Sequence, residues 1–329
     1  MTTLDQILAF DNVKIAWEHV RTKGKTPGVD DWGVRRFARH WEENLRSLIG
    51  EVRANVYKPS PLRIRYVPKK RAAGVQVTGL RVRNSPPDAR NSQYYRRLGI
   101  MTIRDRVLQR AALQVLEWRF ERKFLACSYG YRPKRSLFKA VAAILHYRER
   151  GHGWLLDADI DNCFDSIDHG VLWPLVEQEV WDPPVLRLLE QWLEVGAVDS
   201  EARIGISQGM PISPLLCNVI LHEMDWRLAA RARRALVRYA DDFIVLARTE
   251  IQAYECYGLV EKYLTPLKLV IEPDKTRITS FDEGFDFLGV HFQGDSYSYT
   301  WEDKRVEVSG AHAPPPWALW DYFPHGYEG

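Results

Sequence analysis

Apolar residues recur along the chain with two kinds of spacing. Spacings of two to four residues predict amphipathic helices, and short apolar runs between turn-forming residues predict strands. The helical spacing covers residues 31–57, 104–124, 137–148, 172–180, 184–193, 214–231 and 251–264. The strand pattern covers residues 154–160, 237–239, 243–247, 269–271, 277–281 and 285–292. Together these elements predict an α+β fold.

One predicted hairpin carries adjacent carboxylates. The β-rich segments 237–239 and 243–247 flank Ala240, Asp241 and Asp242, which places both aspartates at the tip. An adjacent Asp pair is also common in ordinary turns, and Asp30–Asp31 elsewhere in this chain suits a helix cap. The pair alone therefore leaves a structural and a catalytic interpretation open.

A third carboxylate changes that picture. Asp159 ends the predicted strand 154–160, so three carboxylates converge at one sheet edge if the strands are neighbours. Like charges so close cannot all stay ionised unless a cation joins them. Two Mg²⁺ ions, about 3.5 to 4 Å apart, would neutralise the cluster and activate an attacking hydroxyl.

The charge of the chain is unevenly distributed. The net charge is +3, but residues 1–150 hold 32 Lys and Arg against 13 Asp and Glu, and residues 151–329 hold 14 against 30. The stretch 58–97 holds eleven basic residues and a single acid, Asp88. Such a field suits phosphate backbones, although a solvated basic loop is the alternative. Within this stretch, residues 72–95 are rich in Gly, Pro, Ser and Asn and predict an irregular insertion or a long hairpin.

Composition excludes several classes of protein. With 329 residues, 46% hydrophobic and 27% charged, the chain is neither disordered nor collagen-like. The apolar runs are far shorter than the roughly 18 residues that span a bilayer. Asp5 interrupts the start of the chain, where a signal peptide would need a continuous apolar run. A cytoplasmic protein without membrane contact is therefore expected. The four cysteines form no C-x-x-C pair, which indicates neither a disulfide framework nor a zinc site.

Six segments carry a resemblance to a known family. Residues 156–169 (LDADIDNCFDSIDH), 207–216 (SQGMPISPLL) and 238–242 (RYADD) resemble the three central motifs of prokaryotic reverse transcriptases of the group II intron type, in the family's order and spacing. Further matches are residues 128–133 (SYGYRP), 272–277 (EPDKTR) and 285–289 (FDFLG), the last resembling the primer grip.

The resemblance implies a right-hand polymerase fold. Fingers with an amino-terminal helical extension would occupy residues 1–153, a palm with an antiparallel catalytic sheet residues 154–292, and a short aromatic, Pro-rich tail residues 293–329, with the thumb reduced or absent. It also implies an RNA-directed DNA polymerase that extends a primer 3′-hydroxyl with deoxynucleotides on an RNA or DNA template. Two Mg²⁺ ions would be its cofactors.

The resemblance further implies roles for individual residues. Asp159, Asp241 and Asp242 would be catalytic and would hold the metal ions, together with the backbone carbonyl of Ile160. By their match to family motifs, it implies that Phe164 is the aromatic sugar gate and that Gln208 and Gly209 lie beside the incoming nucleotide. Lys69 and Arg96 would form a triphosphate clamp, with Arg65 as a further candidate. Lys275 would lie near the leaving pyrophosphate. For Phe164 and Lys275, a core aromatic and a solvated lysine are the structural alternatives.

The chain departs from the family at two places. Where the family has Arg-Pro-Leu-Gly-Ile-Pro, residues 96–101 lack both prolines, which leaves Arg97 open beside Arg96. The short segment after Phe292 and the run 281–285 (FDEGF) resemble reverse transcriptases of CRISPR adaptation modules, which implies the CRISPR integrase complex, or another protein with the thumb function, as a partner. A phage-defence or retron-like reverse transcriptase, and a non-catalytic nucleic-acid-binding assembly subunit, are the alternatives.

Overall fold

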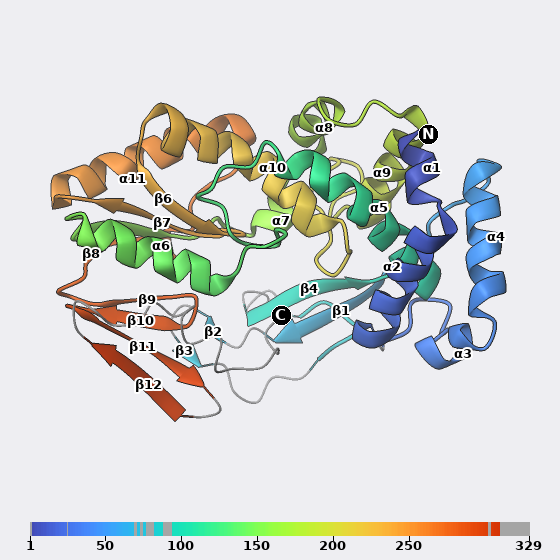
Figure 1. Ribbon diagram of the computed structural model, residues 1–329, viewed down its shortest axis with the longest axis horizontal. Coiled ribbons are helices and arrows are strands. Elements are labelled where there is room, and N and C mark those ends of the chain that lie inside the picture. Colours follow the sequence, from blue (N-terminus) through green and yellow to red (C-terminus); the bar gives the residue numbers. More distant parts are fainter. Residues whose placement is uncertain are drawn as a thin grey trace. The chain divides into compact units, whose positions relative to one another are not determined.

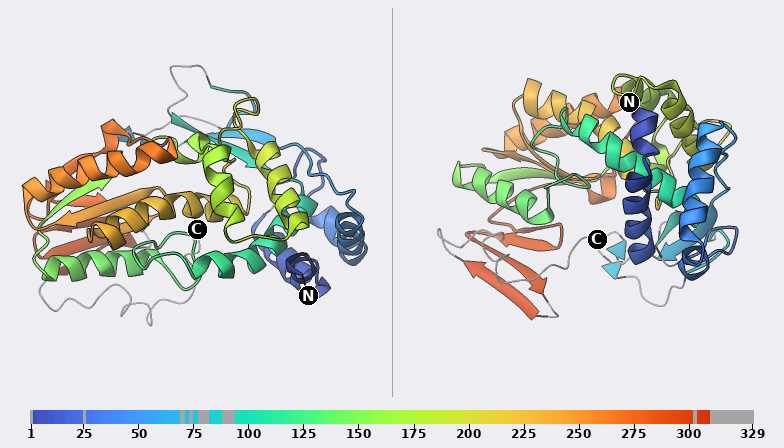
Figure 2. Two further views of the ribbon diagram at one scale, coloured as in Figure 1. Left: turned by 90° about the horizontal axis from the view of Figure 1, so that it is seen from above. Right: turned by 45° about the vertical axis from the view of Figure 1, so that its right-hand side comes forward.

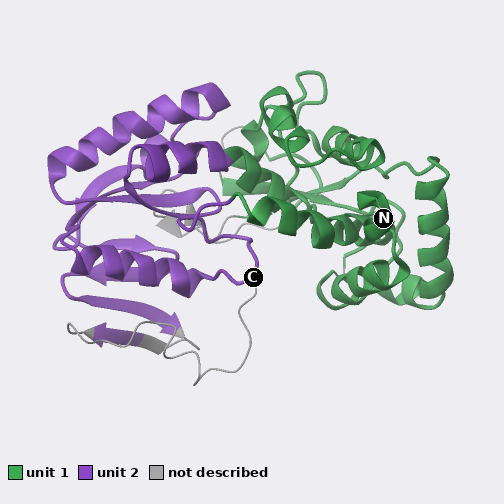
Figure 3. Ribbon diagram, turned by 45° about the horizontal axis from the view of Figure 1, so that its top comes forward, with its two compact units in different colours: residues 1–123, 162–220 green, residues 124–161, 221–329 purple. Residues whose placement is uncertain are grey.

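The computed structural model describes residues 2–24, 26–68, 71–72, 75–76, 82–87, 94–301 and 304–309. The chain divides into two compact units, which are coloured separately in Figure 3. Unit 1 comprises residues 1–123 and 162–220, and unit 2 comprises residues 124–161 and 221–329. The boundaries at 153 and 292 predicted for fingers, palm and tail do not coincide with these units, and that division stays a prediction.

Unit 1 combines helices with two pairs of antiparallel strands. Its elements in chain order are α1 (Thr3–Ile7), α2 (Phe10–Lys23), α3 (Val34–Ala38), α4 (Trp41–Arg53), β1 (Arg63–Pro68), β2 (Arg71–Ala72), β3 (Val75–Gln76), β4 (Tyr95–Ile100), α5 (Ile103–Glu121), α7 (Cys163–Ser166), α8 (His169–Glu177) and α9 (Pro183–Gly196). The chain passes from unit 1 to unit 2 within α10 (Ser213–Asp225). In Figure 1, α2 and α5 lie side by side, and both contribute fully buried apolar residues to the core.

The structure corrects the single helix predicted for residues 31–57. Residues 34–38 form α3 and residues 41–53 form α4, because His40 leaves the helical conformation with φ −132° and ψ 37°. Apolar side chains of both helices are buried, which explains why the spacing looked continuous: Phe37 packs on Trp17 with ring centroids 4.9 Å apart, and Leu45 is fully buried. Hydrophobic spacing records which residues face the core and does not reveal a break in the backbone.

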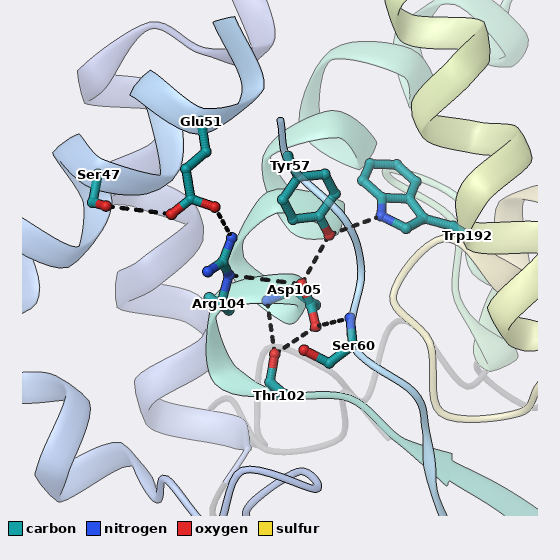
Figure 4. A network of polar contacts seen from close by, with 8 residues as sticks. All are labelled: Ser47, Glu51, Tyr57, Ser60, Thr102, Arg104, Asp105 and Trp192. Atoms are coloured by element: carbon teal, nitrogen blue, oxygen red, sulfur yellow. Dashed lines mark hydrogen bonds and ion pairs between the residues drawn. The ribbon is translucent and has the colours of Figure 1, made fainter. Parts of the chain in front are cut away.

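A buried carboxylate, Asp105, lies where β1 and β4 meet the helices of unit 1 (Figure 4). One of its oxygens accepts hydrogen bonds from the Tyr57 hydroxyl at 2.8 Å, and the other from the Ser60 amide at 3.0 Å and the Thr102 hydroxyl at 2.5 Å. Trp192 donates to the Tyr57 hydroxyl at 3.2 Å. Residues 57–60 lead into β1, and Thr102 follows β4. These bonds therefore hold the beginning of β1 and the end of β4 in place, at one end of the strand pair.

Unit 2 contains two antiparallel sheets. Its elements in chain order are α6 (Leu137–Glu149), β5 (Trp154–Ala158), the π-helix η2 (Trp226–Arg231), β6 (Ala235–Tyr239), β7 (Asp242–Ala247), α11 (Glu250–Leu264), the 3₁₀ helices η3 (Thr265–Leu267) and η4 (Pro273–Lys275), β8 (Arg277–Ser280), β9 (Phe285–Phe287), β10 (Val290–Gln293), β11 (Ser296–Trp301) and β12 (Lys304–Ser309). The strand orders are β6-β7-β5-β8 and β12-β11-β10-β9.

Helices cover both faces of the sheet β6-β7-β5-β8. Figures 1 and 2 show α6 on one face and α11 on the other. Cross-strand register assigns side chains to these faces, since directly paired residues point the same way and successive residues alternate. Leu155, Val237, Ile244 and Leu246 belong to the face that packs with α6 in one buried cluster. The two-sided cover explains why β5, β6 and β7 are nearly continuous apolar runs.

The second sheet corrects two expectations from the sequence. The predicted strand 285–292 is two strands, β9 and β10, because Leu288 and Gly289 turn the chain with φ values of 52° and 77°. Residues 293–329 were expected only as a tail, yet β11 and β12 extend this sheet through residue 309. Residues 310–329, which contain the Pro-rich and most aromatic part, lie outside the described residues.

The predicted α+β class and most predicted elements are confirmed. Within the described residues, however, 269–271 forms only an isolated bridge at Ile271 instead of a strand. For residues 72–95 an irregular insertion or a long hairpin was expected, and the described parts of this stretch include β3 and the start of β4. None of the helices in the described ranges has the length and hydropathy needed to span a bilayer.

Candidate active site

Two of the predicted aspartates lie at the same end of neighbouring strands, Asp159 just past the end of β5 and Asp242 at the start of β7. In the β5–β7 ladder, Ala158 pairs with Phe243. Asp159 directly follows Ala158, and Asp242 directly precedes Phe243, so the antiparallel register, continued past this pair, brings the two aspartates next to each other. Cross-strand neighbours of this kind point to the same face, with Cβ atoms about 4.5 to 5.5 Å apart. Residues 83 apart in the sequence thus form one carboxylate pair.

Asp241 lies beside this pair on a tight turn. Tyr239 pairs with Asp242, so β6 and β7 are joined by Ala240 and Asp241 alone. The sequence had placed Asp242 at the tip as well, and the structure makes it the first residue of β7. Ala240 has a left-handed φ of 58°, which is uncommon for a residue with a side chain. The hairpin that carries the aspartates is therefore as short as an antiparallel connection can usually be.

The carboxylates act on one another electrostatically. Burial raises the pKa of Asp242, and the negative charges of Asp159, Asp241 and Asp157 raise it further, to about 7. The positive charge of Lys275 acts in the opposite direction. Because part of the Asp242 side chain still faces solvent, desolvation does not act alone, and the neighbouring negative charges add to its effect on the pKa. Negative charge is thus concentrated at this edge of the sheet, and a bound cation would reduce the repulsion between the carboxylates.

Lys275 provides one positive charge at this edge. Its ammonium group forms an ion pair with the carboxylate of Asp159. Partial burial acts to lower the pKa of Lys275, but the hydrogen bond and charge of Asp159 and the charges of Glu272 and Asp242 outweigh it, and the pKa is raised. The Lys275 side chain is 42% exposed but ion-paired, and its role near the leaving pyrophosphate stays a prediction.

The backbone at Ile160 leaves its carbonyl out of the neighbouring pairing. Ile160 forms an isolated antiparallel bridge with Ile271. The two hydrogen bonds of this bridge use the carbonyl of Asp159 and the amide of Asp161. Neither uses the Ile160 carbonyl, which is the oxygen that the family resemblance assigns to a metal ion.

The donor atoms fit a hard divalent cation by their chemistry. In the part of the chain that the structure describes, no three His, Cys, Asp or Glu side chains are arranged to hold a metal ion by themselves, and Asp159 is paired with Lys275. Carboxylate and carbonyl oxygens are nevertheless the ligands that Mg²⁺ takes. At Asp242, the negative charges of Asp159, Asp241 and Asp157 act together with burial to raise the pKa, and Lys275 acts in the opposite direction.

Sequence reasoning missed further carboxylates at the same edge. Asp157 is on β5 with its carboxylate bonded to Arg277 at 3.1 Å, and burial raises its pKa to about 6. Burial and a hydrogen bond with Asp161 raise the pKa of Glu272. The signal was present in the alternation of Asp157 and Asp159 along the predicted strand 154–160, because alternate residues of a strand share a face.

In unit 1, the register of β1 and β4 separates Arg96 from Arg97. Arg96 pairs with Val67 and Arg65 pairs with Leu98, which places Arg65 and Arg96 on one face of the strand pair. Arg97 pairs with Tyr66 and belongs to the other face. The sequence left Arg96 and Arg97 open, and the geometry groups Arg96 with Arg65. Lys69 lies outside the described residues.

The glycine of the 207–216 motif packs against β4 in the same unit. The Gly99 amide donates to the Gln208 carbonyl at 2.8 Å, and Gly209 has a φ of 98°. A Cβ at Gly209 would approach the carbonyl oxygen of Gly99 to 2.8 Å. Only glycine combines that conformation with so close an approach. Gln208 and Gly209 are therefore fixed next to the strand that carries Arg96.

Phe164 is joined to the same motif through its backbone. It lies in α7, and its carbonyl accepts a hydrogen bond from the Ile206 amide at 2.7 Å. The Phe164 side chain is 9% exposed. The structure thus brings Phe164, Gln208, Gly209 and Arg96 into one connected part of unit 1, and the aspartates with Lys275 into one edge of unit 2.

Residues 83–292 match the family described as reverse transcriptase (RNA-dependent DNA polymerase). Among curated proteins, the chain is 30% identical over 309 residues to Protein YkfC of Escherichia coli, covering 80% of this chain and 75% of YkfC. It is 33% identical over 226 residues to the group II intron-encoded protein LtrA of Lactococcus lactis, covering 67% of this chain and 34% of LtrA. The chain thus spans about a third of LtrA.

Solved structures give weaker matches. A partial Cas6-RT-Cas1–Cas2 complex has a TM-score of 0.43 at 25% identity, covering 80% of this chain and 41% of that one. Apo telomerase from Candida tropicalis has a TM-score of 0.48 at 11% identity, covering 78% and 52%.

Proposed function

Since the chain belongs to the reverse transcriptase (RNA-dependent DNA polymerase) family, we propose that it extends a primer 3′-hydroxyl with deoxynucleotides on an RNA template. The observation that carries the proposal is the β5–β7 register, which continues past the Ala158–Phe243 pair to bring Asp159 next to Asp242, with Asp241 on the adjoining turn. In the right-hand polymerase arrangement proposed here, this edge belongs to the palm and the β1–β4 pair to the fingers.

The carboxylates would hold divalent metal ions. The ligands we propose are Asp159, Asp241, Asp242 and the Ile160 carbonyl, for two Mg²⁺ ions. When bound, such ions activate the primer hydroxyl and stabilise the departing pyrophosphate. Phosphoryl transfer asks little covalent chemistry of the protein, so the remaining residues have to position the reactants and neutralise charge.

Basic side chains would bind the triphosphate. Arg96 and Arg65 share a face of the β1–β4 pair, and a guanidinium is suited to bidentate contact with phosphate. Lys275 would exchange its contact with Asp159 for a phosphate oxygen, because its ammonium lies at the carboxylate edge. Lys69 completes the proposed clamp on the family resemblance.

Phe164, Gln208 and Gly209 would select the nucleotide. The proposed role of Phe164 is to occupy the space that a ribose 2′-hydroxyl needs. Gly209 permits close backbone approach, as its φ of 98° indicates. Phe164→Ala should then increase ribonucleotide incorporation relative to deoxynucleotide incorporation. Unchanged sugar discrimination in a folded variant would return Phe164 to a purely structural role.

Primer extension tests the carboxylates. Wild type, Asp159→Asn, Asp241→Asn and Asp242→Asn are compared on RNA and DNA templates with Mg²⁺. Asp282→Asn is the matched control, because Asp282 is an exposed carboxylate of unit 2 in a turn. We expect each active-site variant to lose at least about 100-fold in kcat, in the range typical of lost transition-state electrostatics. Activity equal to that of Asp282→Asn would contradict the proposal and favour a non-catalytic assembly subunit.

The biological setting we propose is synthesis of cDNA for CRISPR spacer acquisition from RNA. It rests on the resemblance of residues 281–285 (FDEGF) to reverse transcriptases of CRISPR adaptation modules. In the structure, Phe281 and Phe285 of this run are both buried and pack edge to face, with ring centroids 5.1 Å apart. Co-purification with a CRISPR integrase complex from the host would support it. Recovery with components of a phage-defence or retron-like system would favour those alternatives.

A further inference from the structure

A completely buried cation lies beside the turn that carries the aspartates. Arg238, on β6, and Asp225, the last residue of α10, both have side chains with no solvent exposure. Arg238 donates from Nε to one Asp225 oxygen at 2.7 Å and from Nη2 to the other at 2.5 Å. This bidentate contact fixes the plane of the guanidinium group.

The guanidinium makes a third directed contact, to the turn itself. Nη1 of Arg238 donates to the carbonyl oxygen of Ala240 at 2.8 Å. Ala240 is the first of the two turn residues and directly precedes Asp241. Because Asp225 fixes the guanidinium plane, the direction of this third N–H group, and therefore the position of the Ala240 carbonyl, is also set.

The strand register places the Arg238 side chain on the face of the sheet opposite the Asp242 side chain. Arg238 pairs with Phe243, whereas Tyr239 pairs with Asp242. Successive residues of a strand point to opposite faces, so the Arg238 side chain is on the opposite face of the sheet from Asp242. Arg238 therefore acts on the hairpin through the backbone of the turn.

Neighbouring backbone supports the same turn. The Arg238 amide donates to the Cys127 carbonyl at 2.8 Å, and the Arg238 carbonyl accepts from the Tyr129 amide at 2.8 Å. A Cβ at Gly130 would come within 2.4 Å of the Ala240 nitrogen. Ala240 keeps its left-handed φ of 58° inside these contacts, as expected where surrounding structure over-determines a costly conformation.

We propose that Arg238, oriented by Asp225, is a positioning residue that sets where the turn presents Asp241 and Asp242. The inference rests on the proposed function and adds to it a residue on the opposite face of the sheet. An apolar pair of similar size could fill the same space without the cost of burying two charges. What such a pair cannot supply is the N–H group bonded to the Ala240 carbonyl.

The test separates positioning from packing. In the double variant Arg238→Met with Asp225→Leu, both charges are removed and the volume is kept, so the melting temperature should stay close to that of wild type. Amide exchange of a peptide covering residues 239–243 should become about 10-fold faster, because the turn has lost its tether. The Mg²⁺ concentration for half-maximal primer extension should rise severalfold, with the KM for template-primer unchanged.

A second variant covers failure of the first to fold. Arg238→Lys keeps the buried cation but offers a single ammonium in place of the planar fork, so it cannot make all three contacts together. The matched control is Arg234→Lys, which alters an arginine of an ion pair with Glu255 just before β6. Faster exchange at 239–243 is expected in Arg238→Lys and not in Arg234→Lys.

Exchange at 239–243 and a Mg²⁺ requirement both equal to wild type, in either folded Arg238 variant, would overturn the proposal. The exchange measurement does not depend on catalysis. If the wild-type protein failed to extend primers, the proposed function would fail, and exchange would still decide whether Arg238 holds the turn.

Discussion

Two strand pairs carry some of the proposed site residues, Asp241 and Asp242 on one and Arg65 and Arg96 on the other, and each pair is fixed by a fully buried carboxylate in a different way. In unit 2, Asp225 binds the cation Arg238, which holds the tip of the β6–β7 hairpin. In unit 1, Asp105 accepts its short hydrogen bonds from uncharged groups at the base of the β1–β4 pair, from Tyr57, Ser60 and Thr102, and its ion pair with Arg104 is long, at 4.0 Å (Figure 4).

The difference follows from what each strand pair presents. A tip that gathers negative charge benefits from a cation fixed beneath it, because the turn must hold its position against repulsion among the carboxylates. The base network of unit 1 fixes where β1 begins and where β4 ends, and Arg96 lies six residues before Thr102. The comparison therefore predicts large effects from breaking the buried Asp225–Arg238 ion pair and smaller ones from breaking the hydrogen bonds that uncharged donors make to Asp105.

The largest loss of stability is expected for Asp225→Asn. The amide would offer Arg238 one acceptor and one donor, leaving a buried guanidinium without its full counter-charge. Breaking one side of a buried pair costs about 3 to 5 kcal/mol. Urea denaturation of the variant against wild type measures this loss. A loss smaller than that of Asp105→Asn would reverse the ranking of the two carboxylates.

Asp105→Asn should have the next largest effect. The new NH₂ group would replace one of the two accepting oxygens, so either the Ser60 amide or the Tyr57 hydroxyl would lose its acceptor, at a cost of about 1 to 3 kcal/mol for an unsatisfied buried donor. Since the network anchors the strand pair that carries Arg96, the KM for deoxynucleotide should rise more than kcat falls. A selective fall in kcat would contradict the assignment of this network to the basic strands.

Gly130→Ala tests the support of the turn from its other side. The added Cβ would meet backbone at Ala240, which cannot yield as a flexible side chain would, and overpacking of this kind costs about 1 to 3 kcal/mol. Activity should fall more than stability alone explains. Gly258→Ala is the control: the glycine is exposed within α11 with open space around it, so alanine should raise stability by about 0.5 to 1 kcal/mol.

The smallest effect is expected for Tyr57→Phe. The change keeps the ring and removes the hydroxyl that bridges Asp105 and Trp192, and a typical hydrogen bond contributes about 0.5 to 1.5 kcal/mol. The Asp105 bonds to Ser60 and Thr102 remain, so the KM for deoxynucleotide should change little. An effect as large as that of Asp105→Asn would mean that the phenol dominates the network.

Local patterns in the sequence predicted most elements and the candidate chemistry. The β6–β7 hairpin followed from two β-rich pieces around a short polar turn, and α5, α6, α9 and α11 followed from helical spacing. The family motifs supplied Asp159, Asp241, Asp242, Lys275 and the nucleotide-binding residues, whose proposed roles remain for the experiments above. The break between α3 and α4 was missed, since core-facing residues kept their spacing across it.

The sequence by itself determined which residues are apolar, where the turn that carries Asp241 lies and which motifs the chain has, because these are properties of neighbouring residues. Only the tertiary structure decided that Asp159 lies next to Asp242, that Arg65 joins Arg96, and that Arg238 binds Asp225 under the turn. Each of these depends on strand register or on the burial of two groups together. Register and burial are set by contacts between residues distant along the chain, which local patterns do not encode.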